Sequence, residues 1–256
     1  MSRRALTVAA VIASAGFAAA VAVPTAAEAG STSTATTSDT ATPRSASSSG
    51  RIESVFPAAG QLLVHSVAAR KSPNPGASVI KVMHDFRPDF RPQEILAVKK
   101  QVGSDGNVWY QISLPMRPNG TYGWIPATSV SLAPTSNQIV IDLSARTIDV
   151  YRRGKHAWHG MVAIGAPGRE TPLGHYYVAA RFVPYHDPFL GVFAVETSAY
   201  SKLTEWPGGG VVGIHGTSLP QLLGKAVSHG CVRVSNQTAD ALKRLAPLGT
   251  PIWIKA

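Results

Sequence analysis

Alternating apolar and polar residues predict short strands in the segment 51–133. In residues 108–114 every second side chain is apolar, so these side chains share one face of an extended chain. The sequence Pro-Asn-Gly at 118–120 predicts a turn, and residues 122–126 predict a second short strand after it. We therefore expect this segment to form a small β domain.

The segment 137–256 also consists mostly of predicted strands. A hairpin is expected from residues 139–143 and 147–151, a third strand from 157–164 and a last strand from 252–254. One helix is expected near the end, with Ser235 or Asn236 as its N-cap and Pro247 after Ala246, its last residue. The prediction for the whole chain is a mainly β fold with few short helices.

The first 50 residues have a different composition. Residues 1–29 combine a basic start, the apolar run 5–23 and the small-x-small pattern at 27–29, which together predict a signal peptide cleaved after Ala29. The apolar run approaches the length of a membrane span, so an uncleaved anchor remains an alternative. Residues 30–50 contain 13 Ser or Thr and predict a disordered linker. We expect an exported protein of the cell envelope, without a stable membrane span after cleavage.

Composition and charge limit the classes of function. Hydrophobic residues make up 45% of the chain and can bury a core, while 23 Gly and 19 Pro favour turns and short strands. The net charge is +10, but no run of five to eight Lys or Arg is present, which argues against a nucleic-acid partner. A basic exported protein is attracted to anionic envelope polymers, although simple solubility explains the charge equally well.

The single cysteine is the most informative residue. One cysteine excludes an intramolecular disulfide, and an unpaired thiol in an exported protein favours a catalytic role over a buried structural one. A thiol nucleophile needs a nearby base or cation, and both His215 and His229 are candidates; spacing alone does not decide between them. A zinc site of Cys231 with these two histidines lacks a fourth ligand and is disfavoured. No metal or cofactor is expected.

The residues around Cys231 carry a family resemblance. His215-Gly216-Thr217 followed by the run 224–233, which includes Ser228-His229-Gly230-Cys231-Val232-Arg233, resembles the L,D-transpeptidase catalytic domain, also called the YkuD domain. Upstream, Ile164-Gly165 and Thr171-Pro172-Leu173-Gly174 are similar to a strand and turn of that family, and residues 249–254 to its final strand. The resemblance spans residues 137–256 and implies a mixed β-sandwich.

The resemblance implies roles for individual residues. Cys231 corresponds to the nucleophile, His215 to the general base, and Gly216 to the residue whose carbonyl orients the imidazole. His229 corresponds to an assisting histidine. Ser228 lies in the same motif, and Arg233 and Asn236 correspond to residues that brace the cysteine loop. The backbone N–H groups of Gly230 and Cys231 are the expected oxyanion donors.

A second, shorter resemblance concerns the first β segment. Trp109-Tyr110 with Gly123-Trp124-Ile125, and the earlier residues 67–73, are similar to a bacterial SH3-like domain, a small barrel. This resemblance implies either a wall-binding module or a packing spacer without a ligand, because a fold alone does not give a function.

The main resemblance implies acyl transfer on peptidoglycan. Cys231 would attack the third residue of a donor stem peptide and release D-alanine, and an amine of an acceptor stem would resolve the thioester into a 3→3 cross-link. Carbapenems are expected to acylate Cys231. Alternatives are an L,D-carboxypeptidase, in which water resolves the thioester, and a non-catalytic wall-binding protein. Residues 184–210 are expected to form a flap, with candidate substrate contacts at Tyr185, His186, Phe189, Tyr200 and Trp206.

Overall fold

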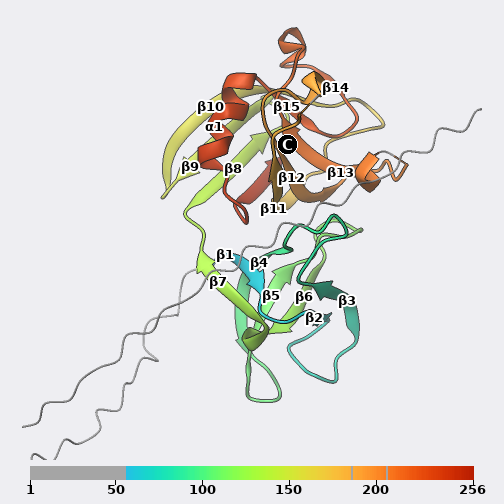
Figure 1. Cartoon of the computed structure of the whole chain (residues 1–256), viewed down its shortest axis with the longest axis vertical. Coiled ribbons are helices and arrows are strands. Elements are labelled where there is room, and N and C mark those ends of the chain that lie inside the picture. The colour runs from blue at the N-terminus through green and yellow to red at the C-terminus, as the bar shows by residue number, and fades with distance from the viewer. Residues whose placement is uncertain (1–55, 186, 206) are drawn as a thin grey trace, which may run out of the picture. The chain divides into compact units, whose positions relative to one another are not determined.

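The computed structural model describes residues 56–185, 187–205 and 207–256, and these residues form two β-sheets (Figure 1). The predicted signal peptide, the predicted linker and the start of the segment 51–133 lie outside the described residues. In the part that is described, no helix is both long and apolar enough to cross a membrane.

The first sheet has seven strands in the order β3-β2-β6-β5-β4-β1-β7. Its strands are β1 (Ala58–Leu62), β2 (Ser66–Arg70), β3 (Val79–His84), β4 (Glu94–Val102), β5 (Val108–Ser113), β6 (Tyr122–Pro126) and β7 (Val130–Pro134). Each pair is antiparallel, and Ile95, Ile112 and Ile125 are fully buried in a core of their own. The strands predicted at 108–114 and 122–126 are therefore present as β5 and β6.

The second sheet has nine strands in the order β14-β10-β15-β13-β12-β11-β16-β8-β9. Its strands are β8 (Asn137–Asp142), β9 (Thr147–Arg152), β10 (Lys155–Gly165), β11 (Gly174–Phe182), β12 (Ala194–Tyr200), β13 (Val211–His215), β14 (Ala226–Ser228), β15 (Val232–Val234) and β16 (Pro251–Lys255). β9 pairs with β10 as well as with β8, so the strand order returns on itself.

This second sheet is mixed. The pairs β13–β15, β16–β8 and β10–β14 are parallel, and the remaining pairs are antiparallel. The predicted hairpin is confirmed as β8 and β9, in which Ile139 lies opposite Val150 and Ile141 opposite Ile148. All four of these side chains are fully buried, as expected for alternate positions that face a core. The mainly β, mixed fold predicted from sequence is therefore confirmed.

The one α-helix among the described residues, α1 (Asn236–Leu245), begins where the sequence predicts. Ser235 is the N-cap, and its side chain accepts a hydrogen bond from the Thr238 N–H at 3.1 Å, which pairs one of the free donors of the first turn. Ala239 and Leu242 are buried in the core of the nine-stranded sheet. The helix follows the cysteine segment directly in the sequence, and its buried residues pack on the nine-stranded sheet. This packing anchors the chain just after the end of β15.

The two sheets also contact each other directly. Tyr177 of β11 is fully buried, and its hydroxyl donates a hydrogen bond to the Glu94 carbonyl at 3.1 Å. Tyr177, Ala179 and Leu96 form a small apolar cluster shared by the two sheets. Burial raises the pKa of the Glu94 side chain to about 7, because the carboxylate loses its hydration.

Candidate functional site

His215 is the last residue of β13 and is buried. Its Nδ1 lies 2.6 Å from the carbonyl oxygen of Gly216, the contact that the family resemblance implies. A carbonyl only accepts hydrogen bonds, so Nδ1 carries the proton and Nε2 is left with a free lone pair. The backbone thus selects the imidazole tautomer that can act as a base.

Cys231 lies in a tight turn between β14 and β15. The Ser228 hydroxyl donates to the Cys231 carbonyl at 2.6 Å and accepts from the Gly230 N–H at 3.1 Å. Gly230 has φ +116°, and a Cβ there would lie 2.9 Å from the Ser201 Cβ, so glycine is required. Thr171 connects the turn to β10: its hydroxyl donates a hydrogen bond to the Gly230 carbonyl and accepts one from the Gly165 N–H, both at 2.9 Å.

Parallel pairing brings the two reactive residues together. β13 and β15 are parallel neighbours, with Ile214 opposite Val232 and His215 opposite Arg233. Cys231, directly before β15, therefore falls next to Gly213, two positions before His215 on the same face of β13. His215 and Cys231 both line one cavity of about 420 Å³. The Gly213 N–H, one strand position before Ile214, points to Cys231 Sγ at 3.4 Å.

Burial keeps both reactive groups in their neutral forms. It raises the pKa of the Cys231 thiol, against the opposing effects of the Gly213 N–H and the Arg233 charge. It also lowers the pKa of His215, although the hydrogen bond to Gly216 acts in the opposite direction. At neutral pH the pair is therefore a thiol beside a neutral imidazole, which suits proton transfer from sulfur to nitrogen during attack.

Two predicted bracing residues, Arg233 and Asn236, contact the segment 189–192, whose Phe189 lines the cavity. Arg233 is buried on β15, and its guanidinium carbon lies 4.6 Å from the centre of the Phe189 ring, which in turn lies 6.0 Å from the His215 ring. Asn236 Oδ1 accepts from the Val192 N–H at 3.2 Å. A Cβ on Gly216 would lie 2.3 Å from the same Oδ1, so the chain after His215 passes too close to Asn236 for any side chain.

His229 occupies a different position from His215. It is partly exposed, and its Nε2 contacts the Arg169 guanidinium. Desolvation and the positive charges of Arg169 and Arg233 lower the pKa of His229. A neutral histidine that contacts an arginine through one ring nitrogen fits an assisting role better than that of the base.

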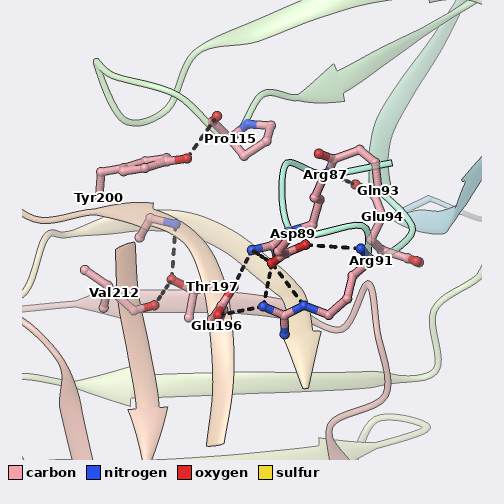
Figure 2. A network of polar contacts seen from close by, with 11 residues as sticks. Arg87, Asp89, Arg91, Gln93, Glu94, Pro115, Glu196, Thr197, Tyr200 and Val212 are labelled. Carbon is pink, nitrogen blue, oxygen red and sulfur yellow. Dashed lines mark hydrogen bonds and ion pairs between the residues drawn. The ribbon is translucent and has the colours of Figure 1, made fainter. Parts of the chain in front are cut away.

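The first sheet contributes charged groups to the cavity that the sequence did not indicate. Arg87 and Asp89, from the loop between β3 and β4, line the cavity together with Glu196 of β12. Figure 2 shows the ion pairs that hold this loop: Glu196 binds both Arg87 and Arg91, the latter at 3.0 Å, and Asp89 binds Arg91 at 2.6 Å. The pattern of the sequence carries no signal that these distant residues meet.

A second loop of the first sheet supports the cysteine turn. The Arg117 guanidinium donates to the Ser201 carbonyl at 2.9 Å and to the Gly209 carbonyl at 2.8 Å. Ser201 is buried and packs against Gly230, as the close approach of its Cβ shows. The position of the cysteine turn therefore depends in part on a residue of the other sheet.

The expectation of a flap over residues 184–210 is only partly correct. The middle of this segment is strand β12, whose small side chains, such as Ala194 and Ala199, are buried between β11 and β13. Phe189 and Gly208 line the cavity, whereas Tyr200 packs against the Arg117 guanidinium at 4.7 Å and does not line it. Tyr185 is 80% exposed. His186 and Trp206 lie outside the described residues.

The expectation of two oxyanion donors in the cysteine turn also needs correction. The Gly230 N–H donates a hydrogen bond to the Ser228 hydroxyl at 3.1 Å. Gly230 therefore shapes the turn, and the oxyanion role of the Cys231 N–H stays a prediction.

Comparison with known proteins gives matches to the second segment. Residues 136–254 match the family model of the YkuD L,D-transpeptidase catalytic domain. The protein named "Putative L,D-transpeptidase YkuD" of Bacillus licheniformis is 31% identical over 117 residues, and its namesake of Bacillus subtilis is 29% identical over 116 residues. These matches cover 46% and 45% of this chain and 64% of each relative.

Among solved structures, an L,D-transpeptidase from Mycobacterium smegmatis is 18% identical, with a TM-score of 0.40; the match covers 58% of this chain and 90% of that one. The sequence and family matches support the expectation for residues 137–256. The SH3-like resemblance of residues 51–133 stays a prediction.

Proposed function

We propose that this protein is a cysteine acyltransferase, an L,D-transpeptidase that forms 3→3 cross-links in peptidoglycan. The observation that supports this most directly is the pair formed by His215, the last residue of β13, and Cys231, directly before β15. Cys231 and His215 line one cavity, and the carbonyl of Gly216 sets the tautomer of the imidazole. The match of residues 136–254 to the L,D-transpeptidase catalytic domain agrees with this assignment.

In the first half-reaction Cys231 Sγ attacks the carbonyl carbon of the third residue of a donor stem peptide. His215 Nε2 takes the thiol proton as the bond forms and returns it to the departing amine of D-alanine. The negative charge on the carbonyl oxygen is stabilised by the Cys231 N–H. The product is a thioester between Cys231 and the shortened stem.

In the second half-reaction the side-chain amine of an acceptor stem attacks the thioester. His215 takes a proton from this amine, and the thiol is restored as the new amide bond forms. Water in place of the amine would give an L,D-carboxypeptidase. Cys231 is partly exposed at the cavity while His215 is buried, so an acceptor amine can reach the thioester from the cavity side.

The charged wall of the cavity suits such substrates. Arg87 carries a positive charge, and Asp89, Asp187 and Glu196 carry negative charges around the same cavity. A diamino acid stem presents both a carboxylate and an ammonium group, which can pair with these residues. We therefore include the loop between β3 and β4 in the substrate-binding surface.

The location follows from the sequence rather than from the described residues. The pattern of residues 1–29 supports export by a signal peptide, and residues 30–50 then act as a tether before the first sheet. We propose that the protein works in the cell envelope, where both stem peptides are found.

The test is mass spectrometry, with sequencing of the products by fragmentation, after the purified protein has been incubated with disaccharide-tetrapeptide. A dimer joined between third residues is the expected product, and Cys231→Ala should give none while keeping the circular dichroism spectrum of the fold. Tripeptide alone would identify an L,D-carboxypeptidase. Unchanged substrate would favour a non-catalytic wall-binding protein.

A carbapenem provides a second, independent readout. The expected adduct has the mass of one intact carbapenem and maps to the peptide that contains Cys231. An adduct on another peptide, or none, would contradict the assigned nucleophile.

A further inference from the structure

Two histidines and an aspartate meet on the hairpin of β9 and β10. His156 Nε2 and His159 Nδ1 each lie 2.8 Å from Asp149 Oδ1. Among the described residues, this is the one set of three histidine, cysteine or acidic side chains whose ligand atoms all lie within 4.8 Å of one another. None of its members lines the cavity of Cys231.

A β-bulge is what brings the two histidines to the same face. Positions 156 and 159 are three apart, so in a regular strand their side chains would point to opposite faces. In β10 the pairing shifts between His156 and Trp158, so that His156 lies opposite Tyr151 and His159 lies opposite Asp149. The extra residue, Ala157, restores a common face, a known effect of bulges.

This face is open to solvent, whereas the other face of the hairpin is packed. The side chains of His156 and His159 are 50% and 56% exposed, and that of Asp149 is 24% exposed. Ile148 and Val150, which alternate with Asp149 on β9, are fully buried and anchor the hairpin to the core. The three polar side chains are therefore accessible, while a rigid strand pair fixes their spacing.

We propose that Asp149, His156 and His159 bind a borderline divalent metal ion, with Zn²⁺ as the reference ligand. Two imidazole nitrogens and one carboxylate oxygen form a ligand set that suits Zn²⁺, Co²⁺, Ni²⁺ and Cu²⁺ rather than Mg²⁺ or Ca²⁺. Zinc bonds of 2.0–2.1 Å at tetrahedral angles place ligand atoms about 3.3 Å apart. The present contacts need to open by about 0.5 Å, which half-exposed side chains permit, and water completes the coordination.

The neighbouring Lys255 does not neutralise the site. Lys255 on β16 is close enough to Asp149 for Asp149 to help raise the pKa of the lysine, but the larger effect is its hydrogen bond to Asp142. The ammonium is held by Asp142 at 2.7 Å. The Asp149 carboxylate therefore keeps its charge for the two histidines or for a metal ion bound among them.

A bound ion would connect the two strands of this hairpin. Asp149 belongs to β9 and both histidines to β10, so coordination adds a cross-strand link to the backbone hydrogen bonds. The expected role is structural: the ion stabilises the pair that joins β9 to β10 and returns the sheet on itself. This role is independent of the proposed acyl transfer.

The test is titration of the full-length, chelator-treated protein with ZnCl₂ in a calorimeter, and with CoCl₂ followed by visible absorption. We expect one ion per chain, a tetrahedral Co²⁺ spectrum and a higher unfolding temperature with Zn²⁺. His156→Gln and His159→Gln should each weaken binding roughly 100-fold. The matched control is His175→Gln, which alters a histidine that stacks on Trp253 and should leave binding unchanged.

Two outcomes would overturn the proposal. One is the absence of Zn²⁺ binding to the wild-type protein, in which case the histidines simply donate hydrogen bonds to Asp149. The other is stoichiometric binding that survives in the His156→Gln, His159→Gln double variant or disappears in Cys231→Ala, since the ion would then lie elsewhere. X-ray absorption of the zinc-loaded wild type identifies the ligands without any variant that could fail to fold. Two imidazole ligands are expected, and a sulfur ligand would refute the site.

Discussion

Replacing Thr171 by valine tests whether the hydrogen bonds of its hydroxyl hold the cysteine turn in place. The Thr171 hydroxyl is buried and serves two backbone groups, the Gly165 N–H and the Gly230 carbonyl. Valine has the same shape but makes neither hydrogen bond. The substitution therefore removes the support of the turn without opening a cavity.

The expected cost follows from the two groups that lose their partner. A buried donor or acceptor without a hydrogen bond costs about 1–3 kcal/mol. The buried methyl group that replaces the hydroxyl stabilises the folded state by about 0.8 kcal/mol. With two such groups, we expect a net loss of about 1–5 kcal/mol in the free energy of unfolding, and each 1 kcal/mol of it lowers the unfolding temperature by about 2–4 °C in a domain of this size.

Thr197→Val is the matched control. Thr197 is equally buried, donates to the Val212 carbonyl at 2.7 Å and accepts from the Ala199 N–H at 3.1 Å, but it does not contact the cysteine turn. Both variants should lose similar stability in urea or thermal unfolding. Only Thr171→Val should also slow the reaction of Cys231, because it alone frees the turn to move.

The reaction of Cys231 is measured by alkylation with iodoacetamide and by acylation with a carbapenem. Since the chain has one cysteine, bulk thiol loss reports on this residue alone. Equal rates in Thr171→Val and in the wild type would refute the supporting role of Thr171. An equal slowing in both threonine variants would also refute it, because the effect would then be one of general destabilisation.

Three further predictions concern a buried carboxylate between the sheets and the close contacts of the site. Burial raises the pKa of Glu94 from 4.5 to about 7, so folding must remove the charge of this carboxylate above pH 4.5. The free energy of unfolding of the wild type should therefore fall relative to that of Glu94→Gln as the pH rises from about 4.5 to 7, by about 3 kcal/mol. Urea unfolding at both ends of this pH range measures the difference. Gly216→Ala should cost about 1–3 kcal/mol and slow acylation because its Cβ meets Asn236, and the double variant with Asn236→Ala should recover part of both losses in a double-mutant cycle. Burial raises the pKa of the Cys231 thiol, so its alkylation rate should still increase above pH 8.5, where a free cysteine is half ionised; a plateau below that pH would contradict the assigned direction.

Local patterns predicted the strands whose faces differ in polarity. The hairpin β8–β9 alternates large apolar and polar residues, and the serine cap fixes the start of α1. β12 was missed because its buried side chains are small and partly polar, so the strand resembles a loop in sequence. Val108 shows the opposite error. The apolar alternation of residues 108–114 predicts that its side chain faces the core, but the side chain is 42% exposed at the start of β5.

The reactive pair was predictable in part, because the motif lies in a short segment. Spacing left His215 and His229 both open as the base, and the family resemblance favoured His215; the structure adds the physical contrast, since the Gly216 carbonyl orients the His215 ring and Arg169 contacts His229. The contribution of Arg87 was not predictable: it depends on a pairing with Glu196, 109 positions away, and nothing in the local pattern of either residue encodes it.

The position of β16 has a consequence for how the protein is made. This strand lies between β11 and β8, whose residues precede it by many positions along the chain. Until residues 251–255 have been synthesised, β11 and β8 each keep an open edge, and the barrel-like closure through β9 and β10 lacks one member. Open edges pair readily with other chains. We therefore expect a chain that lacks residues 251–255 to expose the facing edges of β8 and β11 and to aggregate more readily than the intact chain.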